Sequence, residues 1–402
     1  MANQILTISQ ITRESLRVLV NNLTFSKGVN RQYDDAFAIR GAKIGSTLNI
    51  RKPARYIGRS GPTISVESQT ETYVPLTLST QRGVDVQFTS ADMKLSMDDF
   101  SMRFLKPAMA NVANKIDADG LALAQSVYQS VGTPGTTPTT LQTYLDANAL
   151  LHDAACPVDD MRSTIINATA QSKIVNSLTT VFNPQKTISE QYSEGKMGLA
   201  IGNKWSMDQN VFSHTSGNFS GTPLVNGASQ TGSALVTDGW GASIASLLTV
   251  GDIFTIAGVF MVNPQSRQNT GRLQQFVVTA LASSNGGGQS TLQISPAITP
   301  SGQFQNVTAS PADNAAITVL GAAATVSPLN LVHHRDAFVL ASADLDLPNG
   351  VHAAAREQDP ESGLSVRMIQ AYDVTNDLFI TRLDVLYGWA AVYPELACRV
   401  AG

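Results

Sequence analysis

The feature that most constrains the fold is a long, nearly uncharged segment in the middle of the chain, residues 213–321. Only five of its residues carry charge, while Gly, Ser, Thr, Asn and Gln dominate and the apolar runs are short. Solvent-facing helices need charged faces, whereas strands joined by tight turns can use neutral polar residues. The segment therefore predicts a compact all-β barrel or sandwich, with strands at 253–256, 260–262, 276–278 and 292–294.

The sequence on both sides of this segment alternates helical and strand-like patterns. Helical spacing predicts an N-terminal arm over 7–23 and a helix that starts near Ser96–Pro107 and runs about 22 residues from Pro107, stopping before Gly132. Similar patterns predict helices at 139–155, 168–178 and after Pro184, and strands at 74–78, 84–88, 163–166, 198–211, 365–369 and 379–388. The pattern predicts an α/β domain that the uncharged segment interrupts and the C-terminal part completes.

Residues 41–73 combine Gly and Pro with short alternating runs, which predicts a long two-stranded excursion that cannot bury itself. Six basic residues and no acidic residue lie between Asp35 and Glu67. Three roles are open for the basic run: nucleic-acid binding, a solvated loop, or contact with an acidic neighbouring subunit. We favour subunit contact, for which the candidate residues are Arg51, Lys52, Arg55 and Arg59 on the basic side and Asp98, Asp99, Glu357, Asp359 and Glu361 on the acidic side.

Charge, cysteine and hydropathy patterns exclude several classes of protein. A formal net charge of -4 argues against coating nucleic acid through a basic excess. Cys156 and Cys398 are far apart and lack metal-site spacing, which indicates neither a disulfide scaffold nor a cysteine metal site and fits a reducing cytoplasm. We find no secretion-signal pattern and no apolar run near the roughly 18 residues of a membrane span.

Catalytic motifs for dinucleotide binding, phosphate loops, esterase elbows and zincins are absent from the sequence. We assign structural rather than catalytic or metal-binding roles to three weaker patterns. His152 and Cys156, four apart on a predicted helix, lack a third metal ligand nearby. His333 and His334, beside Asp336, would point to opposite faces of a strand, and the turn 344–350 lacks the closing glutamate of a calcium loop. We therefore expect no enzyme activity, no cofactor and no metal.

The order of these features resembles that of coat proteins with the Hong Kong 97-like fold, and most of all the short-tailed Salmonella phage type with a telokin-like insertion domain. Four segments carry the resemblance: LNIRKPAR at 48–55, DDFSMRFLKPAM at 98–109, GDIFTI at 251–256 and HRDAF at 334–338. The resemblance implies an α+β fold with an N-terminal arm (1–40), an E-loop (41–73), P-domain strands with a long spine helix (74–135), an A-domain (136–212), an inserted all-β barrel (213–325), and the A-domain completion with C-terminal P-domain strands (326–402).

The function that this resemblance implies is that of a major capsid protein, which self-assembles into hexamers and pentamers of an icosahedral phage head around double-stranded DNA. Implied partners are other copies of the chain, a scaffolding protein, a portal, and packaged DNA through weak non-specific contact, with no membrane. Assembly would occur in the host bacterial cytoplasm and the product would be the virion capsid. Some relatives cross-link Lys to Asn, which we do not carry over because the sequence does not mark Lys43 or Lys52 as desolvated and catalytically placed. The alternative is an encapsulin-like shell of a bacterial compartment, against which the inserted β domain argues.

Overall fold

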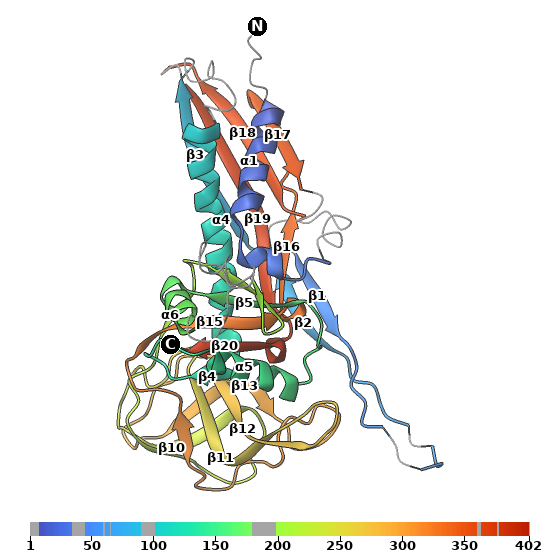
Figure 1. The fold of residues 1–402 in the computed structure, drawn as a ribbon, viewed down its shortest axis with the longest axis vertical. Helices are drawn as coiled ribbons and strands as arrows, with labels where there is room; N and C mark the ends of the chain where they lie inside the picture. Colours follow the sequence, from blue (N-terminus) through green and yellow to red (C-terminus); the bar gives the residue numbers. More distant parts are fainter. Residues whose placement is uncertain are drawn as a thin grey trace. The chain divides into compact units, whose positions relative to one another are not determined.

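The computed structural model describes residues 8–33, 45–58, 61–64, 66–89, 101–178, 198–359, 363–375 and 378–401. The predicted helix after Pro184 and the predicted helix start at Ser96 lie outside these ranges. The chain forms two compact units. The first contains Met1–Arg51, Tyr73–Gly120 and Phe338–Val392, and the second contains Lys52–Thr72, Leu121–Ala337 and Tyr393–Gly402 (Figure 1).

The first unit is built on a five-stranded antiparallel sheet. Its central strand, β19, pairs with β16, β18 and β3, and β17 extends the sheet beyond β18. The predicted N-terminal helix is confirmed as α1 (Ile8–Asn22), which packs on β17 and β18 and buries Ile11, Ser15 and Leu19, four residues apart. The strands are β3 (Thr80–Thr89), β16 (Phe338–Ala343), β17 (Ala353–Gln358), β18 (Ser365–Asp373) and β19 (Leu378–Ala391).

Helix α4 (Lys106–Leu121) follows a π-helical turn, η3 (Ser101–Leu105), and has Pro107 in its first turn, as predicted. The N–H that Pro lacks breaks no hydrogen bond within α4 itself, because the residue four positions earlier, Arg103, belongs to η3. Met109, Val112 and Ile116 lie on its buried face. The helical stripe seen in the sequence is therefore the packing face of α4.

The α-helix is shorter than the predicted length of about 22 residues, so that prediction is wrong. The α-helix ends at Leu121 and a 3₁₀ helix, η4 (Ala122–Ser126), follows. The Arg399 guanidinium donates to the carbonyl oxygens of Gln125 at 3.0 Å and Val127 at 2.6 Å. Carbonyl groups at a helix end need such partners, and here a distant side chain supplies them and holds the tighter turn.

The predicted two-stranded excursion is confirmed by a separate pair of strands, β1 (Thr47–Lys52) and β2 (Thr72–Thr77). The loop between them, residues 53–71, joins the ends of this pair.

The second unit contains a seven-stranded mixed sheet in the order β4-β20-β15-β5-β7-β6, with β8 paired to β15. The predicted helices α5 (Leu141–Asp153) and α6 (Ala168–Leu178) are confirmed, and α5 contributes Tyr144 to the core, where its ring lies 4.8 Å from that of Trp205. The strands are β4 (Ser130–Gly132), β5 (Arg162–Ile166), β6 (Leu199–Ala200), β7 (Asn203–Met207), β8 (Ser213–Thr215), β15 (Val326–His334) and β20 (Ala397–Ala401).

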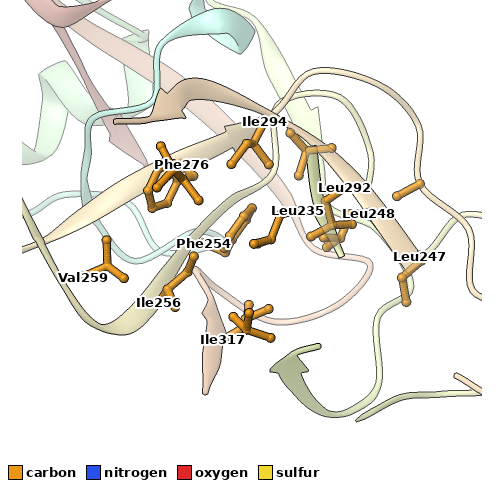
Figure 2. Close-up of a cluster of buried hydrophobic side chains, with 14 of the residues drawn as sticks. Leu235, Leu247, Leu248, Phe254, Ile256, Val259, Phe276, Leu292, Ile294 and Ile317 are labelled. Carbon is orange, nitrogen blue, oxygen red and sulfur yellow. The ribbon is translucent and has the colours of Figure 1, made fainter. Parts of the chain in front are cut away.

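The uncharged segment folds into the predicted β structure, a six-stranded antiparallel sheet in the order β14-β11-β12-β13-β10-β9. Its outer strands meet, because Leu224 bridges to Ala316 and the Val225 N–H donates to Ala315 at 3.0 Å, so the sheet closes toward a barrel. Figure 2 shows the apolar interior that results. The strands are β9 (Gly221–Val225), β10 (Gly232–Trp240), β11 (Ile253–Val262), β12 (Asn269–Val278), β13 (Ser290–Ile298) and β14 (Ile317–Val319).

One detail of the strand prediction is wrong. The runs 253–256 and 260–262 belong to a single strand, β11, whose register with β12 shifts between Thr255 and Phe260. Gly258, at φ +80°, lies in this shift. A glycine that adopts positive φ lets the strand bulge and then continue. In the sequence, the same glycine interrupts the apolar pattern and so suggests that the strand ends.

The two ends of the barrel segment leave and re-enter the seven-stranded sheet side by side. β8 pairs with the start of β15, with Thr215 opposite Val326. On β12, the Gln275 side chain accepts from the Ser130 N–H at 2.7 Å and donates to its carbonyl oxygen at 2.8 Å, which extends hydrogen bonding from the barrel to β4. Arg399 of β20 also donates to the Gly251 carbonyl at 2.7 Å. The barrel is therefore held by polar contacts as well as by its two connections.

Candidate subunit-contact site

Hydrogen bonds within the loop between β1 and β2 join its two arms. The Glu67 carboxylate accepts hydrogen bonds from the backbone N–H groups of Ile57 and Gly58, both at 2.8 Å. The Gln69 amide donates to the Tyr56 hydroxyl at 2.7 Å. These bonds join the outgoing and returning arms, which run side by side beyond β1 and β2 in Figure 1. The loop is thus a paired structure rather than a loose connection.

Arg55 is held by the chain's own residues. Its Nη2 lies 3.1 Å from Oε1 of Glu395, in the 3₁₀ helix η6 (Pro394–Leu396), and its guanidinium carbon lies 6.0 Å from the centre of the Phe304 ring. A half-buried ion pair with an aromatic neighbour contributes modestly to stability and strongly to geometry. Arg55 therefore fixes the start of the loop. Its predicted contact with another subunit stays a prediction.

Lys52 is half-buried, with its Nζ 5.0 Å from the centre of the Tyr393 ring. Burial lowers the pKa of Lys52, while the Glu395 carboxylate acts in the opposite direction. Lys52 is therefore partly desolvated, which the sequence does not mark, because distant parts of the chain rather than its sequence neighbours cover it.

The remaining predicted contact residues are dispersed. Arg51 is exposed on β1, and Glu357 is half-buried on β17. Asp359 closes the turn after β17, since its N–H donates to Leu364 at 2.9 Å and its carbonyl accepts from Gly363 at 2.8 Å. Of the described candidates, Lys52 and Arg55 line one cavity. Four candidates lie outside the described residues, namely Arg59, Asp98, Asp99 and Glu361.

Sequence reasoning missed three residues of this site, Phe304, Tyr393 and Glu395. Each contacts the loop start from a position hundreds of residues later. No local pattern marks them. The Pro at the start of η6 indicates only a short helical turn, so their role depends on the tertiary fold.

Apolar side chains on the loop are exposed to solvent. Ile64 and Val66 are 79% and 89% exposed, and Tyr56 and Ile57 are 56% exposed each. Single exposed apolar residues are common on proteins, but a group on one short loop indicates a surface that another molecule covers.

The adjacent histidines of the sequence analysis are closed off from solvent. His333 and His334 are buried, and burial lowers the pKa of His333 to about 4, so the ring is neutral near pH 7. His334 Nε2 lies 3.1 Å from Oδ2 of Asp159, an exposed residue, so the buried ring contacts a surface carboxylate. Substrate cannot reach either ring. Among the described residues no cluster of potential metal ligands occurs, and no helix is long and apolar enough to cross a membrane.

The predicted helical pair of His152 and Cys156 is also corrected. Helix α5 ends at Asp153, so Cys156 lies beyond it, buried, and burial raises the pKa of its thiol. His152 instead lies near Arg162, with Nε2 3.3 Å from Nη1. The turn at Asp344 is tied by an ion pair to Arg356 at 3.2 Å, as suits a structural turn.

Comparison with known proteins identifies the family. Residues 1–402 match the family model described as P22 coat protein, gene protein 5. The chain belongs to the P22 coat protein family. It is therefore a major capsid protein of a bacteriophage, and its fold is the α+β Hong Kong 97-like capsid fold with an inserted β barrel, as predicted. No curated protein matches the sequence at a significant level.

Solved structures similar to this coat protein are remote. Mycobacterium phage Che8 is 12% identical, with 94% of this chain and 90% of that chain covered and a TM-score of 0.44. The capsid structure of the cyanophage P-SCSP1u is 11% identical, with 89% and 84% covered and a TM-score of 0.42. The CUS-3 coat protein I-domain is 29% identical over 25% of this chain and 96% of that domain, with a TM-score of 0.19. The family assignment accordingly rests on the sequence match.

Proposed function

We propose that this coat protein closes into hexamers and pentamers of an icosahedral head that encloses double-stranded DNA, and that it has no enzymatic activity. Assembly takes place in the host bacterial cytoplasm, with a scaffolding protein and a portal, and DNA is contacted weakly and without sequence specificity. The division into N-terminal arm (1–40), E-loop (41–73), P-domain strands and spine helix (74–135), first part of the A-domain (136–212), inserted barrel (213–325), and A-domain completion with P-domain C-terminal strands (326–402) is part of the proposal.

The exposed apolar loop between β1 and β2 is the observation that carries this proposal. Ile64 and Val66 lie on a loop that Glu67 holds in paired form, so their exposure is built into the fold. Burial of one such side chain contributes roughly 1.5–3 kcal/mol. A contact of this kind between unlike surfaces of identical subunits is heterologous, and it forms rings when the rotation between neighbouring subunits brings the last subunit back to the first.

Electron microscopy of the purified protein, alone and co-expressed with the genes beside its own, tests the proposal. Rings of five and six subunits and closed shells are expected. A chain that stays monomeric under all these conditions would contradict it. The contents of the shell distinguish a phage head from an encapsulin-like compartment. Nuclease-protected double-stranded DNA supports a phage head, whereas protein cargo in a shell without DNA supports the compartment.

A further inference from the structure

A cavity of about 390 Å³ lies at the start of the loop, within the second unit. Its size suits a side chain with part of the backbone that carries it. Its walls combine residues 52–55 of the loop, Ala154 and Pro157 after α5, Gln265 and Phe304 of the barrel, and Tyr393 and Glu395 near the C-terminus.

Positive charge exceeds negative charge in this cavity. Among the described residues Glu395 is the only acid in its lining, and it is paired with Arg55 at 3.1 Å. No carboxylate oxygen of the described chain lies within 4.0 Å of the Lys52 ammonium, whose near neighbour is the Tyr393 ring at 5.0 Å. A ring face replaces only part of the hydration that a half-buried ammonium loses. The cavity therefore has room and charge for one further anionic group.

We propose that this cavity receives a carboxylate side chain from a second copy of the chain, which pairs with Lys52 in the assembled shell. The proposal rests on the proposed function and names one contact by which it is achieved.

Charge and surface continuity favour a second copy as the source of the carboxylate. A nucleic-acid backbone is bound by several exposed cations, whereas in this cavity Arg55 is already paired with Glu395 and Lys52 is half-buried. The loop that starts at the cavity also carries the exposed apolar Ile57, Ile64 and Val66, which a free anion would leave uncovered. The chain has 31 acidic residues against 27 basic ones, so each copy can supply a carboxylate.

Zero-length cross-linking tests the contact directly. Shells are assembled from equal amounts of unlabelled and ¹⁵N-labelled full-length chain and treated with a water-soluble carbodiimide, which joins an amine to a carboxylate in contact with it. Mass spectrometry should find peptides that join Lys52 to an Asp or Glu, with mixed-isotope pairs as abundant as unmixed pairs. The same peptides should be absent from unassembled subunits.

Variants distinguish loss of the Lys52 contact from a general loss of protein stability. Lys52→Met should abolish the cross-link and raise the concentration needed for assembly about tenfold. Lys52→Arg should retain assembly, since it keeps the charge, and Lys204→Met, at an exposed lysine on β7, should change neither readout.

Three results would overturn the inference in shells that form normally: cross-links from Lys52 to Glu395 of its own copy only, cross-links to a different polypeptide, or none at all. Failure to form any shell would instead contradict the proposed function, and the contact with it.

Discussion

Gly120 of α4 lies so close to Trp389 of β19 that a Cβ at position 120 would fall 2.6 Å from the indole ring. The ring cannot move away easily, because its other neighbour is Phe25, stacked at 5.4 Å between ring centres. The closeness of helix and sheet in the first unit thus depends on the absence of one side chain.

Gly120→Ala should therefore destabilise the protein, although Ala is the better helix former. Helix propensity favours Ala by about 1 kcal/mol, and overpacking in a rigid core costs about 1–3 kcal/mol. We expect the free energy of unfolding to fall by about 1 kcal/mol, measured by urea denaturation of unassembled subunits. The matched variant Ala118→Gly should lose stability through propensity alone, and Trp389→Phe in the Gly120→Ala background should recover part of the loss. A gain in stability for Gly120→Ala would show that the ring can yield.

Asp117→Asn should weaken the contact between the N-terminal arm and α4. The buried carboxylate accepts from the backbone N–H groups of Thr24 at 2.6 Å and Ser26 at 3.0 Å, and also from the Ser26 hydroxyl. An amide keeps one acceptor oxygen and turns an N–H₂ group toward these donors, at a cost of about 1–3 kcal/mol. Urea denaturation measures the loss, and protease cleavage within α1 should become faster. Asp146→Asn is the control and should change neither, because its carboxylate accepts a single exposed bond from Gln142, which the amide oxygen can still accept.

The parts of the fold that local interactions determine could be predicted from sequence. Helix α6 was predicted with its observed bounds, and its start is set by the neighbouring Asn167, whose side chain accepts from the Ala170 N–H at 2.8 Å. The barrel was predictable because a nearly uncharged segment has few other ways to fold. The end of α4 could not be predicted, because it depends on the distant Arg399. The partner of Arg55 could not be predicted either, because Glu395 is 340 residues away.

The protein should lose stability on acidification through His333. Burial depresses the pKa of His333 from 6.5 to about 4, so between these values the unfolded chain binds a proton that the folded chain does not. Stability is then present above about pH 6.5 and declines as the pH falls toward 4, by about 3 kcal/mol for this group. Urea midpoints at pH 7 and pH 4.5 measure the difference. His333→Gln should reduce it, and His352→Gln, at an exposed histidine, should leave it unchanged. An equal acid response in all three proteins would assign the loss to carboxylates.

The double variant Ile64→Ser and Val66→Ser should prevent assembly without changing the stability of the subunit. Both side chains are exposed in the single chain, so their loss should alter the free energy of unfolding by less than about 0.5 kcal/mol. In a shell, the two contacts together are worth roughly 3 kcal/mol per subunit, enough to shift the assembly equilibrium far toward free chains. Sedimentation velocity gives the fraction assembled. Leu281→Ser, at a 63% exposed residue of the barrel, removes a similar apolar surface from another place. Assembly lost with Leu281→Ser but retained in the loop variant would place the subunit contact on the barrel instead of the loop.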